Sequence, residues 1–151
     1  MSLWSQLKTH TQGFSTQLKT KVGQFQNKEF ANASMAMCAL IAAADGRIDD
    51  AERTKVSALI TSNDVLAVFP PAELTTKFDI YCNKLSTDFN LAKVELTQVV
   101  AKVRPKPDQA RAVIQIGIII GGADGNFDPN ERAVVREACL ALGVSPQEFD
   151  L

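Results

Sequence analysis

The hydrophobic and polar positions of this chain follow a helical pattern, and nowhere do they alternate strictly as in a half-buried strand. Residues that favour helices, such as Ala, Leu, Lys, Glu and Gln, are frequent, and Pro or Gly residues separate the apolar segments. The pattern predicts helices at roughly 27–44, 50–62, 71–87, 91–103, 108–123 and 129–142, a short helix from Pro146, and one or two helices before residue 25. We therefore expect an all-α fold, a compact bundle of about seven to nine helices.

Two ten-residue segments of the chain are nearly the same. Residues 44–53 and residues 123–132 are identical at six of ten positions, and both contain an Asp-Gly pair followed by an acidic helix start. Each segment follows an apolar run and precedes another segment with a helical pattern. The repeat predicts an internal duplication of a helix–turn–helix hairpin, with a pseudo-twofold axis that relates the two copies.

Each repeated segment carries signals for the start of a helix. Asp49 and Asp128 are placed to accept hydrogen bonds from the first backbone N–H groups of the next helix. Glu52 and Glu131 follow three residues later and complete a predicted capping box in both copies. Capping therefore explains these four carboxylates without any bound ligand.

Residues 1–28 form a predicted basic amphipathic helical segment, distinct from the domain at 29–151. The segment contains four lysines and no acidic residue, and its apolar residues fall near one face of a helix. Such a segment lies on an anionic membrane surface or docks on a partner, here through Trp4, Leu7, Lys8, Phe14, Lys19 and Lys21. The alternative is a helix that folds back and buries Trp4 and Phe14 against the domain.

Composition and charge exclude several classes of protein. With 151 residues, 46% of them hydrophobic, the chain can form one domain with a buried core. Its formal net charge of −1 argues against nucleic-acid binding, which depends on neutralising phosphates. The most apolar segment, 112–123, is too short to span a bilayer, and the pattern of a secretory signal is lacking. The cysteines are far apart, so we expect reduced, buried thiols in a cytoplasmic protein: Cys38, Cys82 and Cys139.

The acidic turns have a second interpretation as a cation site. Each turn matches the second half of the calcium loop of EF-hands, but the first half lacks its ligands, so a true EF-hand is excluded. If the two turns meet, they bring six carboxylates together: Asp45, Asp49, Glu52, Asp124, Asp128 and Glu131. Crowded carboxylates repel one another unless a cation lies among them, and all-oxygen ligands favour calcium, magnesium or manganese over zinc.

Several short motifs occur together, in order, over the whole chain. They are the basic N-terminal helix, Gln26-Asn27-Lys28-Glu29-Phe30, Asn83-Lys84-Leu85, the two Asp-Gly…Glu turns, and the ending Gly143…Phe149-Asp150-Leu151. In this order and spacing the chain resembles the TerB family of tellurite-resistance proteins. The resemblance implies a compact helical fold of two related halves, with a TerB-like domain at 29–151.

The resemblance also implies a function. It implies a divalent-cation site at the six carboxylates of the turns, from which the chain departs modestly in having Arg47 where the second copy has Asn126. It implies a role in the chemical-stress response, with other tellurite-resistance proteins as partners, an integral-membrane one among them. The implied location is the cytoplasm, peripherally at the inner face of the membrane.

No catalytic residues are predicted. The only histidine is His10, in the N-terminal segment, and the chain has neither a nucleophile elbow nor a phosphate-binding loop. Tellurite is an oxyanion, which an acidic cluster repels. Among the cysteines, only Cys82 is a candidate for thiol chemistry, because Lys84 is near it in the sequence.

Two functional interpretations therefore remain open. In the first, the protein is a non-enzymatic, cation-binding regulatory or scaffold module in membrane-associated complexes. In the second, it is a metal-independent adaptor whose acidic face binds a basic protein partner.

Overall fold

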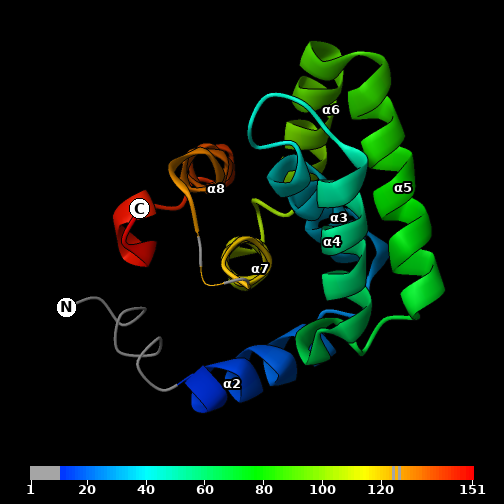
Figure 1. Ribbon diagram of the computed structural model, residues 1–151. Coiled ribbons are helices and arrows are strands. Elements are labelled where there is room, and N and C mark those ends of the chain that lie inside the picture. Colours follow the sequence, from blue (N-terminus) through cyan, green and yellow to red (C-terminus); the bar gives the residue numbers. More distant parts are fainter. Residues whose placement is uncertain (1–10, 124, 126) are drawn as a thin grey trace.

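The computed structural model describes residues 11–151 except 124 and 126, and side chains from residue 18 onward. The described chain is all-α, as predicted (Figure 1). Its seven α-helices and two short 3₁₀ helices are α2 (Thr11–Gln24), α3 (Lys28–Ala42), α4 (Asp50–Ser62), η1 (Asp64–Leu66), α5 (Pro71–Thr87), α6 (Phe89–Ala101), α7 (Pro107–Gly121), α8 (Pro129–Leu142) and η2 (Pro146–Phe149). Among these helices, none is both long and apolar enough to cross a membrane.

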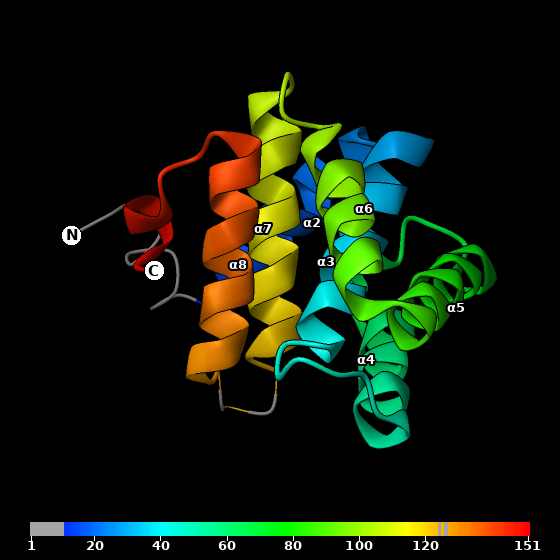
Figure 2. The ribbon, with the colours of Figure 1, turned by 90° about the horizontal axis from the view of Figure 1, so that it is seen from above.

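Helix α3 lies at the centre of the bundle. Every residue from 33 to 42 is buried, and α3 contacts each of the helices α4 to α8. A helix that is apolar on all sides has to be covered on all sides, which fixes α3 as the core. Helices α7 and α8 lie on one side of α3 and α4 and α5 lie on the other, while α6 contacts both α5 and α8 (Figure 2).

Most helix boundaries agree with the sequence prediction. Helices α4, α5 and α8 begin and end at the predicted residues, whereas α6 begins two residues earlier than predicted. The reason is Asp88, whose side chain accepts a hydrogen bond of 3.2 Å from the backbone N–H of Leu91 and so caps the helix at Phe89. The 3₁₀ helix η1 was not predicted.

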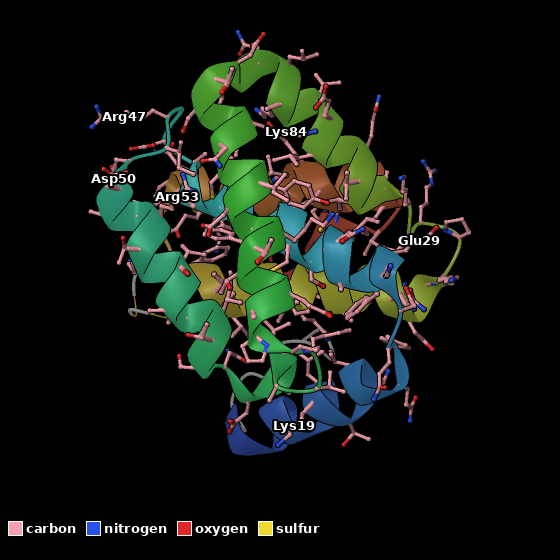
Figure 3. All side chains as sticks on the ribbon, turned by 90° about the vertical axis from the view of Figure 1, so that its right-hand side faces the viewer. Lys19, Glu29, Arg47, Asp50, Arg53 and Lys84 are labelled. Atoms are coloured by element: carbon pink, nitrogen blue, oxygen red, sulfur yellow. The ribbon has the colours of Figure 1, made fainter. Side chains whose placement is uncertain are left out.

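Helix α2 packs against the domain, on α7 and η1. Its residues Leu18 and Val22 are buried, while Lys19 and Lys21 are exposed (Figure 3). Phe14 lies within α2 but its side chain is not described, and the remaining residues predicted to contact a membrane or partner lie outside the described chain: Trp4, Leu7 and Lys8.

The internal duplication of a hairpin stays a prediction. Two pairs of consecutive helices lie at its predicted places, α3–α4 and α7–α8. Each joins its helices through a turn that contains one of the repeated Asp-Gly pairs. The pseudo-twofold axis between the hairpins stays a prediction.

Candidate functional site

The glycines of the two acidic turns have the same backbone geometry. Gly46 and Gly125 both have positive φ angles, +96° and +80°, which a residue with a Cβ adopts only with strain. Each glycine also donates its backbone N–H to the carbonyl oxygen three residues earlier, at 3.0 Å, on Ala43 and Gly122 respectively. The repeated glycine therefore produces the same bend after α3 and after α7.

Aspartate side chains cap the helices that follow the turns. Asp49 Oδ1 accepts a hydrogen bond of 2.7 Å from Glu52 N, and Asp128 Oδ1 accepts one of 2.8 Å from Glu131 N. In the second copy Glu131 Oε1 also accepts a bond of 3.1 Å from Asp128 N, which completes the capping box. The box predicted for the first copy is present only in part, because Asp49 caps the helix without the return hydrogen bond from Asp49 N to the side chain of Glu52.

A pocket of about 200 Å³ opens between the two turns. Figure 2 shows that both turns lie at the same edge of the molecule, although they are far apart in the sequence. The pocket is lined by Asp45, Asp49 and Glu52 from the first copy, by Asp128 and Glu131 from the second, and by Lys55, Ile41, Ala42 and Ala44. Five of the six acidic residues predicted for the cation site therefore share one pocket, and Asp124 lies outside the described residues.

The pocket is negatively charged. Four of its carboxylates are half-buried, and the lining contains five carboxylates but one lysine, Lys55. Arg47 contributes little, because its side chain is 79% exposed and its Nε stands 4.0 Å from Asp45 Oδ2 at the periphery (Figure 3). Carboxylates held together at the mouth of a small pocket attract a cation.

The donor chemistry of the pocket fits a hard divalent cation. Carboxylate oxygens are the ligands that calcium, magnesium and manganese prefer, and capping occupies only one of the two oxygens of Asp49 and Asp128. In the described part of the chain, however, no three acidic, histidine or cysteine residues form a group that could hold a metal ion as they stand.

The arginine that ends each repeated segment was not predicted as part of the site. Arg53 joins α4 to α5, since its Nη1 donates to Asn83 Oδ1 at 2.9 Å and its Nη2 lies 3.3 Å from Asp79 Oδ1 (Figure 3). Arg132 joins α8 to the C-terminal residues, since its Nη2 donates to the carbonyl oxygen of Asp150 at 2.8 Å. Both arginines occupy the last position of the repeated segment. This repetition in the sequence could have marked them as structural residues.

The three cysteines are free and buried, as predicted. Burial raises the pKa of each thiol from 9.0 to about 12, for Cys38, Cys82 and Cys139. Next to Cys82, Arg53 lowers the pKa, but by less than burial raises it. All three thiols are therefore protonated at neutral pH, which disfavours nucleophilic or reductive chemistry at Cys82.

The chain was compared with known proteins and solved structures. Residues 31–151 match the family model described as tellurite resistance protein TerB. Over 118 residues the chain is 26% identical to the tellurium resistance protein TerB of Alcaligenes sp, a match that covers 78% of this chain and 97% of the relative. No solved structure gives a significant match. The matched range includes both acidic turns and the pocket between them.

Proposed function

Because the chain belongs to the TerB family of tellurite resistance proteins, we propose that it acts in tellurite resistance as a non-enzymatic module whose acidic pocket binds a divalent cation. The observation that supports this most directly is the shared pocket, in which carboxylates from two turns far apart in the sequence face one another. Helix capping explains Asp49 and Asp128 separately, but it gives no reason for the two turns to meet.

The carboxylates of the pocket hold the cation in this proposal. The cation supplies the positive charge that offsets their repulsion. Asp49 and Glu52 then move toward Asp128 and Glu131, which brings the starts of α4 and α8 together. Arg53 attaches α4 to α5, and Arg132 attaches α8 to the C-terminal residues. The movement therefore also shifts residues outside the pocket.

The proposed module works through partners rather than through chemistry on tellurite. The carboxylates of the pocket repel an oxyanion, and the buried thiols are protonated at neutral pH. The exposed lysines of α2, Lys19 and Lys21, support contact with an anionic membrane surface. We propose that the protein works in membrane-associated complexes with other tellurite-resistance proteins, at the inner face of the membrane.

Thermal melting with and without divalent cations tests the cation site. Calcium, magnesium or manganese should raise the melting temperature, because the ion binds only the folded pocket. At an ion concentration about 100 times the Kd, we expect a rise of about 5–10 °C. Chelator should reverse the rise.

A charge-neutral variant separates ion binding from helix capping. The charge-neutral variant combines four substitutions: Asp49→Asn, Glu52→Gln, Asp128→Asn and Glu131→Gln. Its amide side chains can still cap both helices, but the pocket loses four negative charges. This variant should melt at the same temperature in calcium and in chelator. The control is Asp88→Asn with Glu73→Gln, which changes a helix cap and a helix start away from the pocket and should keep the full response.

The second interpretation, a metal-independent acidic adaptor, predicts a different result. Melting of the wild-type protein would be indifferent to divalent cations and to chelator. A basic peptide would instead bind the pocket, and its affinity would weaken as the salt concentration increases. That outcome would replace the cation site with a protein-binding site.

A further inference from the structure

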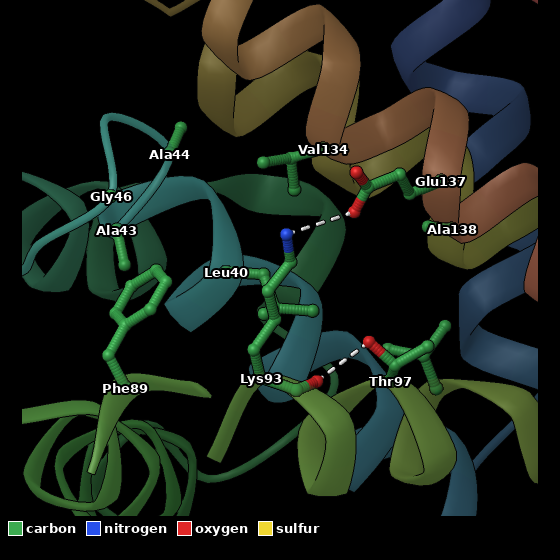
Figure 4. Close-up of a pocket in the computed structure, with 11 residues that line it drawn as sticks. Leu40, Ala43, Ala44, Gly46, Phe89, Lys93, Thr97, Val134, Glu137 and Ala138 are labelled. Atoms are coloured by element: carbon green, nitrogen blue, oxygen red, sulfur yellow. Dashed lines mark hydrogen bonds and ion pairs between the residues drawn. The ribbon is translucent and has the colours of Figure 1, made fainter. Parts of the chain in front are cut away.

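A second pocket lies behind the first acidic turn, and its walls are mainly apolar. It has a volume of about 90 Å³ and lies between α3, α6 and α8 (Figure 4). Its apolar lining includes Leu40, Ala43, Phe89, Val134 and Ala138. Small side chains on α3, on the turn and on α8 leave this space open, so we refer to it as the apolar pocket.

An ion pair lies at the edge of the apolar pocket. Lys93 Nζ is 3.4 Å from Glu137 Oε2, and the two side chains are 42% and 59% exposed (Figure 4). A pair this exposed is weak, so the Lys93 ammonium can turn toward another acceptor at little cost. Leu140 follows Glu137 by three residues on α8 and is 65% exposed.

The size of the apolar pocket indicates what it can bind. Ligand pockets usually measure roughly 300–1,000 Å³, far more than this one. An engineered apolar cavity of about 150 Å³ holds one benzene, so about 90 Å³ has room for one aliphatic side chain. A single side chain held in a pocket beside exposed apolar surface is the usual anchor of a protein–protein interface.

We propose that the apolar pocket receives one aliphatic side chain of a protein partner, of the size of leucine. The backbone carbonyl next to that side chain accepts a hydrogen bond from Lys93. Glu137 and Leu140 then lie at the rim of the interface.

Partner docking and cation binding are coupled through the first turn, and this step rests on the proposed function. Ala44 lines both pockets, so the turn is the wall between them. A movement of Asp45 and Asp49 toward the cation therefore changes the shape of the apolar pocket. If cation binding changes the affinity of the apolar pocket for the partner by some factor, partner binding changes the affinity for the cation by the same factor.

The docking site is tested with a single capped amino acid, in chelator so that no cation is needed. N-acetyl-leucinamide is titrated into the full-length protein while the methyl resonances of Ala43, Ala44 and Ala138 are followed by NMR. We expect these resonances to shift and saturate. N-acetyl-glycinamide has the same peptide groups without the side chain, so it should bind at least roughly tenfold more weakly. Equal shifts with both amides would overturn the proposal.

Two variants and a third compound locate the bound groups. Val134→Phe fills the apolar pocket and should abolish the shifts. Val99→Phe, at a half-buried valine of α6 that does not line the pocket, should leave them unchanged. Lys93→Met keeps the alkyl stem without the charge, and it should raise the Kd of N-acetyl-leucinamide by about two- to fivefold. If 2-methylpropan-1-ol, which has no peptide group, binds as tightly as the amide, the assignment to a protein segment is wrong.

A titration in calcium distinguishes failure of the docking site from failure of the cation site. If both proposals hold, the Kd of N-acetyl-leucinamide differs between calcium and chelator, and this difference disappears in the charge-neutral variant. Equal Kd values with retained binding would refute the coupling and leave the docking site intact.

Discussion

The carboxylate groups at the starts of α4 and α8 can serve two purposes, because each has two oxygens. One oxygen of Asp49 and one of Asp128 cap the following helix, at 2.7 and 2.8 Å. The second oxygen of each is outside the cap, and the side chains line the acidic pocket. At this scale, capping and cation binding are compatible functions of the same residue. The sequence could not decide between them, and neither interpretation excludes the other.

The buried thiols give the protein a stability that depends on pH. Burial raises the pKa of Cys38 from 9.0 to about 12 in the folded state. The unfolded chain therefore loses this proton first, so the stabilisation is complete below pH 9 and is lost as the pH rises toward 12. In urea titrations between pH 9 and 11, Cys38→Ala should lose stability less steeply than the wild type, by about 1.4 kcal/mol per pH unit. Parallel slopes would contradict the shift of this pKa.

Two equivalent positions of the repeat, one at the end of the first helix and one in the turn, hold side chains of different size in the two copies. The second copy has Gly121 and Phe127 where the first has Ala42 and Ile48. A Cβ at Gly121 would lie 2.9 Å from Phe127 Cε1, closer than side-chain atoms approach one another. The small residue in α7 therefore makes room for the larger aromatic ring of the second turn.

A double-mutant cycle tests this exchange of volume. Gly121→Ala should destabilise the protein by about 1–2 kcal/mol, because the new methyl group displaces the Phe127 ring. In a Phe127→Ile background the same change should be neutral or stabilising, since alanine favours a helix over glycine. Urea unfolding measures both. Gly23→Ala in α2, where a Cβ meets no atom within 4 Å, is the control and should be neutral or stabilising in either background. Equal effects of Gly121→Ala in both backgrounds would show that the ring and the glycine are independent.

At the scale of the whole molecule, α2 is part of the folded domain and also carries exposed positive charge. Leu18 and Val22 are buried, while Lys19 and Lys21 point to solvent. The two sequence interpretations of this segment therefore apply to different faces of one helix. Folding back applies to Leu18 and Val22, whereas Trp4 and the side chain of Phe14 lie outside the described residues. Membrane or partner contact stays a prediction for the lysines.

Vesicle sedimentation tests the membrane contact without removing the buried residues of α2. Full-length protein should sediment with vesicles that contain phosphatidylserine and not with neutral vesicles. Lys19→Gln with Lys21→Gln should weaken this binding by roughly thirtyfold, at about 1 kcal/mol per lysine. Lys102→Gln with Lys106→Gln removes two other exposed lysines and should have no effect. If both double variants sediment alike, α2 does not mediate membrane contact.

The sequence by itself determined the helices, the two turns and the acidic residues they carry. These features are local: caps, breakers and positive-φ glycines act over a few residues, so α4, α5 and α8 were predicted to the residue. The start of α6 was missed because several polar residues before it could have served as the cap.

Only the tertiary structure decided that the two turns share one pocket. Their meeting depends on α3, whose burial on all sides brings α7 and α8 against it and so places residues 44–53 beside 128–131. The apolar pocket behind the first turn has the same origin, because it is the space left between side chains of three helices. Packing of this kind depends on the shapes of many distant side chains together, which no local pattern in the sequence specifies.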